Sequence, residues 1–261
     1  MEMHNFAKKI LAAAVVAGGC APAMAADLYE PPVIEVPAPV YGGWYIRGHI
    51  GMSNQDFDGL DSSLYDNPTI ADFGWYDEGG FASAPLFGAG VGYEFNDYLR
   101  GDLTVEYRGK SDFEALDWVD STVTGLTTND FRAKKSEWLI MANAYADLGT
   151  FYSVTPYLGA GIGASRNTIS HFRDVNIITG GGGYADEESE WNLAWALHAG
   201  LGIEATERLT IDLGYSFVSL GDAKTGTFHN DDPAFDIDND GFEFNDIYSH
   251  DIKLGVRYAL Y

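Results

Sequence analysis

The sequence has 261 residues, with 39 acidic side chains against 15 basic ones, a net charge of −24 and a single Cys. The acidic balance excludes nucleic acid as a partner, because phosphates require a basic surface. One Cys excludes an internal disulfide framework and a Cys-based zinc finger. Aromatic residues make up 14% of the chain, too many for a disordered protein, and no run of eighteen or more apolar residues predicts a membrane-spanning helix. A soluble all-β protein, or a membrane protein that crosses the bilayer with strands, remains.

Residues 1–25 have the organisation of a secretory signal peptide. A pair of lysines precedes the apolar stretch 10–17, and a small-residue cleavage site, Ala-Met-Ala, ends at Ala25. Cys20 raises the alternative of a bacterial lipoprotein, in which a lipid-bearing Cys becomes the new N-terminus. Residues 17–19 lack the large aliphatic side chain of that motif, so we expect Cys20 to be removed with the signal peptide.

Residues 26–42 contain four prolines, at positions 31, 32, 37 and 39. Proline at this density favours an extended, non-helical backbone. We expect this segment to be a Pro-rich linker, which lies in the periplasm if the rest of the chain is membrane-bound.

The remainder, residues 43–261, alternates apolar and polar side chains with a period of two. Between residues 98 and 110, for example, Leu103, Val105 and Tyr107 share one face, and the opposite face is polar or charged. A period of two is that of a β-strand. Eight segments follow this pattern: 43–54, 86–95, 98–110, 136–148, 155–167, 191–204, 208–220 and 247–261.

The lengths of these segments and of their connections favour a membrane barrel. Each segment has about ten residues or more, and a tilted strand needs ~9–11 to cross the hydrocarbon layer. Tight turns alternate with long polar connections, as in a transmembrane barrel with short periplasmic turns and long extracellular loops. The long connections are 55–81, 111–135, 170–190 and 221–246. The predicted fold class is all-β: an eight-stranded antiparallel transmembrane β-barrel over residues 43–261, in the outer membrane.

A soluble, lipocalin-like barrel gives the same alternation, with its apolar face turned inward around a small ligand. Gly42-Gly43-Trp44 even matches the G-x-W that opens a lipocalin. The opposite face favours the membrane barrel, because it repeats glycine and carries charges of both signs, a composition suited to a narrow lumen. The charged and histidine side chains then expected in the lumen are Arg47, His49, Arg100, Asp102, Glu106, Arg108, Lys110, Asp147, His198, Glu204, Asp212, Asp251, Lys253 and Arg257.

An eight-stranded barrel is just wide enough to be filled by side chains, and opposite charges inside it should form salt-bridged networks. We therefore predict a structural, envelope-stabilising barrel whose loops contact the surroundings. A narrow porin-like channel is the second hypothesis and an outer-membrane enzyme the third. None of the histidines lies in a nucleophile motif, so no catalytic residue is predicted.

The fourth long connection carries half of a calcium-binding motif. Asp236, Asp238 and Asp240 precede Gly241 in the spacing that opens such a loop, but position twelve, where a bidentate Glu belongs, is Ile247. The three aspartates are the predicted site for a divalent cation such as Ca²⁺, and no other cofactor is predicted. Loops this acidic would also share divalent cations with the phosphates of lipopolysaccharide.

Three strand segments carry recognisable motifs: GWYIRG at 43–48, TPYLGAGIG at 155–163 and HDIKLGVRY at 250–258. Together they resemble the small alphaproteobacterial outer-membrane β-barrel proteins, the rhizobial and Brucella-type surface-antigen family, which shares such motifs with OmpA/OmpX-type barrels. The chain departs from that family at its end, where Tyr258-Ala259-Leu260-Tyr261 replaces the usual aromatic-x-Phe.

The resemblance implies an eight-stranded barrel with structural and surface-exposed roles. The partners it implies are outer-membrane lipid and lipopolysaccharide, the outer-membrane assembly machinery, and host or environmental surface ligands at the loops. The family offers no catalytic residues to carry over to this sequence.

Overall fold

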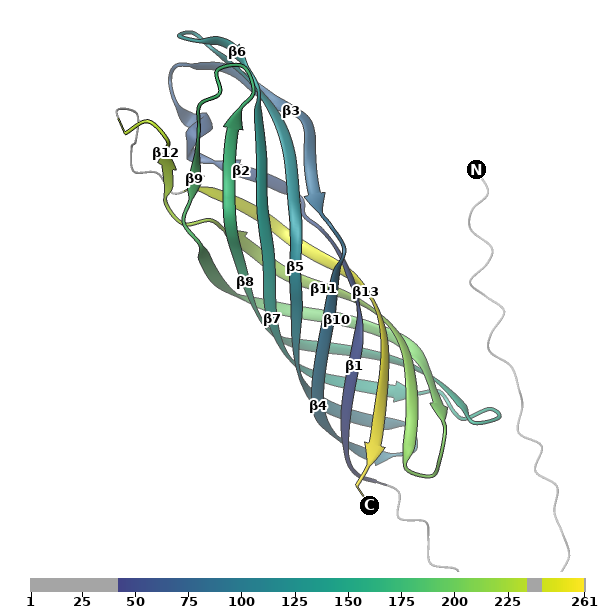
Figure 1. Cartoon of the computed structure of the whole chain (residues 1–261). Coiled ribbons are helices and arrows are strands. Elements are labelled where there is room, and N and C mark those ends of the chain that lie inside the picture. The colour runs from purple at the N-terminus through teal and green to yellow at the C-terminus, as the bar shows by residue number, and fades with distance from the viewer. Residues whose placement is uncertain (1–41, 234–240, 261) are drawn as a thin grey trace, which may run out of the picture. The chain divides into compact units, whose positions relative to one another are not determined.

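Eight antiparallel strands close into a ring in the computed structural model, which describes residues 42–233 and 241–260. Their order is β10-β11-β13-β1-β4-β5-β7-β8, and pairing of β8 with β10 completes the ring (Figure 1). The first and last strands are neighbours, with Arg47 opposite Arg257. The ring strands are β1 (Gly43–Asp56), β4 (Ala84–Asn96), β5 (Leu99–Ser121), β7 (Asn129–Asp147), β8 (Val154–Asn176), β10 (Glu188–Glu204), β11 (Leu209–Lys224) and β13 (Phe242–Ala259).

Further strands extend the ring at the end opposite to Gly43 and Ala259, which we call the distal end. β2 continues the pairing of β1 with β13, and β3 continues the pairing of β4 with β5. Among the described residues, no helix has both the length and the hydrophobicity to span a bilayer. The additional elements are β2 (Gly59–Ser62), the 3₁₀ turn η1 (Ser63–Asp66), β3 (Ile70–Phe81), β6 (Gly125–Thr127), β9 (Gly182–Ala185) and β12 (Phe228–Asn230).

In the proximal part of the ring, nearest Gly43 and Ala259, apolar side chains face outward and polar side chains face inward. Leu103 is 60% exposed and Leu254 is 53% exposed, whereas Arg100 is 1% and Glu106 is 5% exposed. A lipid-facing wall around a polar lumen requires this orientation. The predicted orientation is therefore confirmed, and the lipocalin-like alternative, which needs the reverse, is wrong.

β-Bulges reverse this orientation in the distal part of several strands. On β5 the pairing with β7 skips from Arg108 to Ser111, so that Arg108 and Phe113 both point inward. On β8 a register shift falls beside His171, which has a φ of 56°, and on β13 Asp246 has a φ of 49°. One extra residue turns every later side chain to the other face of the sheet. The same alternation therefore places polar residues inside at the proximal end and apolar residues inside at the distal end.

Beyond the bulges the strands enclose an aromatic core, and we call this part of the ring the distal extension. Phe113 and Phe244 meet edge to face with ring centroids 4.9 Å apart. The buried phenylalanines of this core are Phe81, Phe113, Phe131, Phe172, Phe228, Phe242 and Phe244, and Phe57 packs against them.

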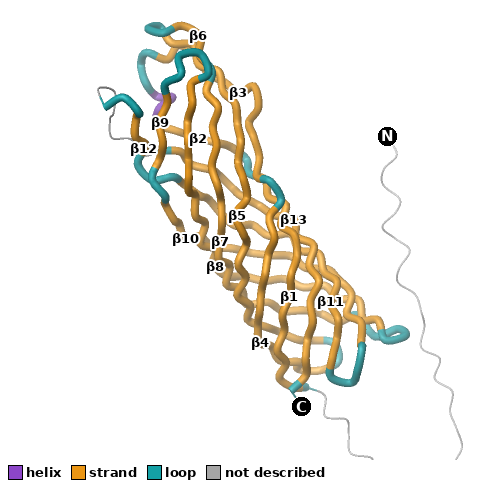
Figure 2. The backbone as a smooth tube through the Cα atoms, viewed as in Figure 1, coloured by secondary structure: helices purple, strands orange, loops and turns teal. Residues whose placement is uncertain are grey.

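The distal extension corrects one expectation from the sequence. The segments 55–81, 111–135, 170–190 and 221–246 are not mainly loops, because strand structure runs through most of their described residues (Figure 2). Apart from buried side chains such as Asp117 and Lys135, the described charges of these segments occupy the outer face of strands whose inner face is largely apolar. Charge content alone made these segments resemble solvated loops.

The predicted signal peptide, residues 1–25, and nearly all of the predicted linker, residues 26–42, lie outside the described residues. Both therefore stay predictions, as does the removal of Cys20 with the signal peptide.

Candidate functional site: the barrel interior

Asp102 joins three strands in the proximal lumen. Arg47 Nη1 donates to its Oδ2 at 2.6 Å and the Tyr45 hydroxyl donates to the same atom at 3.1 Å. Asn143 Nδ2 donates to its Oδ1 at 2.8 Å. These partners come from β1 and β7, whereas Asp102 lies on β5. The carboxylate thus ties β5 to its neighbour β7 and, past β4, to β1.

Two further ion pairs lie beside this group. Lys253 Nζ donates to Glu106 at 2.7 Å, and His49 Nε2 lies 3.0 Å from the same carboxylate. Arg257 Nε donates to Asp212 at 2.8 Å. All five side chains are buried, so each pair is shielded from bulk water and screening by salt is weak.

Arg108 is the centre of the next layer. Its side chain is fully buried, and it donates to Glu137 Oε1 at 2.8 Å and to Asp251 Oδ2 at 2.5 Å. Lys135 also pairs with Glu137, and Gln55 Nε2 donates to Glu137 at 3.1 Å. Four strands (β1, β5, β7 and β13) contribute to this layer, so it crosses the whole lumen.

Little open space is left between these layers. A cavity of about 30 Å³ lies among residues that include Thr104, Tyr145, His198, Asp212 and Lys253. This volume holds one or two water molecules, far less than a continuous aqueous path needs. The aromatic core of the distal extension then fills the interior beyond Arg108, so the lumen is closed by two successive layers of different chemistry.

Inward-facing glycines make room for large neighbouring side chains. A Cβ added at Gly92 would overlap the ring of Tyr45, and one at Gly88 would overlap the imidazole of His49. Glycine in a strand interior often marks such a close approach. The expectation that the glycine repeats serve a crowded lumen agrees with this packing.

Two of the charged residues expected in the lumen lie elsewhere. Lys110 sits in the bulge of β5 and is exposed, and Glu204 ends β10 at the proximal rim and is also exposed. The alternation predicted the inward direction correctly up to Arg108. It failed at Lys110 because a bulge depends on pairing with the neighbouring strand and leaves no clear signal in the sequence.

The distal extension holds a pair of carboxyl groups that sequence reasoning missed. Asp117 is buried and accepts from the Tyr65 hydroxyl at 3.0 Å and from the Asn129 backbone N–H at 2.8 Å. Within the described residues, Asp174 Oδ1 is buried without a hydrogen-bond partner. Burial, and then repulsion by Asp117, raises the pKa of Asp174 to about 7. Burial also raises the pKa of Asp117.

Four described histidines lie within hydrogen-bond reach of a hydroxyl or a carboxylate: His49 with Glu106, His250 with the Tyr215 hydroxyl, His198 and His229. His198 Nδ1 is 2.8 Å from Ser216 Oγ, but this pair borders the 30 Å³ cavity inside the wall, where a substrate has no room. His229 Nε2 is 3.3 Å from Asp186 Oδ2 on the outside of the distal extension, with the Asp186 side chain 62% exposed. A hydrolytic site also needs a positioned nucleophile and a stabiliser of developing charge. The Asp186–His229 pair is far from meeting this requirement at the enclosed cavity, because neither residue lines the 30 Å³ cavity beside His198.

The predicted cation ligands Asp236, Asp238 and Asp240 lie outside the described residues. The calcium site therefore stays a prediction. In the ranges 42–233 and 241–260, no group of three or more His, Cys, Asp or Glu side chains has an arrangement suited to hold a metal ion.

A closed ring of antiparallel strands with an apolar outer wall and a charged interior defines a transmembrane β-barrel, because closure pairs the backbone groups that lipid cannot solvate. The chain belongs to the outer membrane protein beta-barrel domain family, whose model matches residues 11–259. It is an integral protein of the bacterial outer membrane. Because such barrels have short periplasmic turns and longer extracellular segments, we infer that the distal end is the extracellular end.

Three relatives show how far the similarity extends. An uncharacterized protein of Brucella abortus is 30% identical, over 90% of this chain and 92% of its own length. The outer membrane protein PagN of Salmonella typhimurium is 26% identical, over 83% of this chain and 90% of its own length. A Rickettsia bellii protein named as a candidate adhesin is 27% identical, over 65% of this chain and 72% of its own length.

Proposed function

We propose that this protein is a closed structural barrel that holds a rigid interaction surface outside the cell. The observation that carries the proposal is the double closure of the interior. The ion-paired layer around Arg108 crosses the lumen, and the aromatic core around Phe113 and Phe244 fills the space beyond it. Such an interior anchors the extracellular strands firmly and leaves no path for solutes.

Planar-bilayer recording tests the closed lumen against a narrow channel. Purified protein inserted at low density should produce no stable single-channel steps at moderate voltage. Steps of constant amplitude from the wild-type protein would refute the closed lumen and favour the channel.

The tip of the distal extension supports the surface role. Val123 is 76% exposed in the turn between β5 and β6, and Ile178 is 63% exposed in the turn between β8 and β9. The β8–β9 turn is fastened to the frame, since the Ile177 N–H donates at 2.8 Å to the carbonyl of Thr128, which lies between β6 and β7. Exposed apolar side chains held on a rigid frame are typical of contact sites. The similarity to a candidate adhesin points to the same role.

Attachment of bacteria that produce the protein tests this role. Cells with the wild-type barrel should bind an epithelial monolayer better than cells with Val123→Ser and Ile178→Ser. Both substitutions lie on the exposed tip, so they leave the barrel folded, and heat-modifiable migration in a detergent gel checks this. Equal attachment by the two strains would show that the tip is not the contact site.

No catalytic role is proposed. The Ser216–His198 pair is enclosed within the membrane wall, and the Asp186–His229 pair lies exposed on the outside of the distal extension. Exposed ion pairs of this kind contribute little to structure and do not position a reaction without further groups.

A further inference from the structure

The basic residues that do not serve the lumen are concentrated on one side of the barrel. Arg208 lies in the proximal turn before β11 and Lys224 ends β11. The others lie on the outer wall of β5, β7 and β8, which are neighbours in the ring. These are Lys110, Arg132, Lys134, Arg166 and Arg173, and we call them the basic face.

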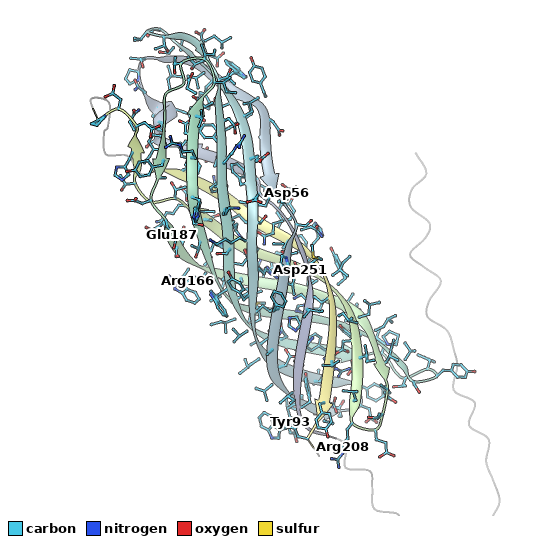
Figure 3. All side chains as sticks on the ribbon, viewed as in Figure 1. Asp56, Tyr93, Arg166, Glu187, Arg208 and Asp251 are labelled. Atoms are coloured by element: carbon cyan, nitrogen blue, oxygen red, sulfur yellow. The ribbon has the colours of Figure 1, made fainter. Side chains whose placement is uncertain are left out.

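Arg166 lies at the level of the outer aromatic girdle. The strand register places it directly opposite Trp138 on β7 and Trp191 on β10, and Tyr107 on β5 is opposite Trp138. Trp138 is 48% exposed and Trp191 is 58% exposed. Aromatic side chains of this kind mark the boundary between hydrocarbon and headgroups. Arg166 therefore projects outward at that boundary (Figure 3).

The next row toward the outside is made of hydroxyl groups. Ser136 on β7 is opposite Thr168 on β8, which is opposite Ser189 on β10. Lys110 is at the same level on β5, in the bulge that turned it outward. Hydroxyl and ammonium groups directly above a row of aromatic side chains suit an anionic headgroup, since they offer donors where charge begins.

The charges of Arg166 and Lys110 are available to a ligand. Within the described part of the chain, neither has an acidic partner or another polar interaction. Lys134 pairs with Asp112, and both side chains are largely exposed, at 42% and 63%. Exposed pairs of this kind are weak and exchange readily for a stronger anion. Higher on the same face, the pairs are Arg132 with Asp130 and Arg173 with Asp231.

On the other side of the barrel, β1, β4 and β13 carry no Lys or Arg on their outer face in the described residues, and Lys224 of β11 lies 3.9 Å from Glu190. Asn54 on β1 is opposite His250 on β13, and Asp56 follows Asn54 outward on the same strand. Ser83, which precedes β4, donates its hydroxyl to Asn54 Oδ1. Five of the seven described basic residues outside the lumen therefore lie on β5, β7 and β8, whereas Lys224 is the one that β11 contributes near this level.

We propose that the basic face binds the phosphate groups of lipid A, the phosphorylated lipid anchor of lipopolysaccharide in the outer leaflet. Arg166 takes one phosphate at the girdle, Lys110 and the hydroxyl row support it, and Lys134 exchanges Asp112 for it. The acyl chains then lie against the apolar wall below Trp138 and Trp191. This inference rests on the outer-membrane location of the barrel and is independent of whether the lumen conducts.

Binding of lipid A to the purified full-length mature barrel in zwitterionic detergent micelles tests the proposal. Thermophoresis titrations compare bisphosphorylated lipid A with lipid A from which the phosphates have been removed. The double variant Arg166→Gln/Lys110→Gln should bind the phosphorylated form roughly 25-fold more weakly, because a basic side chain near a charged membrane surface contributes about fivefold in affinity. Arg208→Gln, an exposed Arg at the opposite end of the barrel (Figure 3), should change the affinity less than about twofold.

The outcomes separate the alternatives. Equal affinity for the two lipids, or an unchanged affinity in the double variant, would overturn the assignment. If millimolar inorganic phosphate displaced lipid A from the barrel as effectively as unlabelled lipid A does, the site would be a simple anion site, and the assignment to a lipid would be overturned. Heat-modifiable migration confirms that each variant is folded, so a loss of binding is not a loss of the barrel.

Discussion

Replacement of Arg108 by Ala removes the central cation of the luminal network. Arg108 is fully buried between Glu137 at 2.8 Å and Asp251 at 2.5 Å. Lys135 still pairs with Glu137, and Lys253 lies 3.5 Å from Asp251. In the variant, the buried carboxylates of Glu137 and Asp251 lose the guanidinium that they share, and water hardly reaches this region to replace it. Removal of one partner from a buried ion pair costs about 3–5 kcal/mol, and we expect Arg108→Ala to destabilise the barrel by about that amount.

Equilibrium urea unfolding in lipid vesicles measures this loss. Tryptophan fluorescence follows unfolding, since Trp138 faces outward from the wall and leaves the lipid when the barrel opens. The matched control is Arg208→Ala, a proximal-turn Arg, which should shift the free energy of unfolding by less than about 0.5 kcal/mol. Addition of Asp251→Asn to Arg108→Ala should recover part of the loss, because it removes one unpaired charge.

A loss below about 1 kcal/mol for Arg108→Ala, with no recovery in the double variant, would refute this reasoning. It would mean that water screens the network as it does at a surface. The lumen would then be wet, and the closed interior that supports the proposed function would be wrong.

Three further predictions concern other parts of the interior. Phe244→Ala should lower the free energy of unfolding by about 3–5 kcal/mol, because it leaves a cavity in the distal core. Hydrogen exchange in the distal extension should rise, while heat-modifiable migration of the barrel persists. Unchanged exchange would contradict a packed core. Since the pKa of Asp174 is raised to about 7 in the folded protein from 3.8, its contribution to stability is fully present below its ordinary pKa and is lost as pH rises through about 7. Proteolysis of the distal extension should therefore increase between about pH 5 and pH 8, and Asp174→Asn should weaken this dependence. An identical profile in the variant would exclude Asp174 as a source of it. Gly92→Ala should lower the yield of folded barrel, because a Cβ there overlaps the Tyr45 ring, and Tyr45→Ala in the same chain should restore the yield; no restoration would assign the defect to the backbone.

The pH response of Asp174 follows from its neighbours. Asp117, Asp130 and Asp231 raise its pKa and Arg173 lowers it, but burial is the first cause. Because Asp117 is held by Tyr65 and Asn129, it stays close to Asp174. Mild acid is therefore expected to tighten the distal extension.

The sequence by itself determined the number of strands in the ring and the direction of the proximal side chains. Alternation of period two is a local property, so it placed Leu103 outward and Arg100 inward without knowledge of any neighbour. Glycine repeats and charges of both signs on the inner face indicated a crowded lumen, and the motifs at 43–48 and 250–258 indicated the family.

Only the tertiary structure decided where the alternation changes face. A bulge such as the one at Lys110 depends on the pairing of β5 with β7, which sequence order does not contain. The bulges convert segments that looked like acidic loops into strands around Phe113 and Phe244, and they turn Lys110 outward. In the same way, only the register across β7, β8 and β10 brings Trp138 and Trp191 beside Arg166. The physical reason is that side-chain direction is set within a strand, whereas contacts are set between strands.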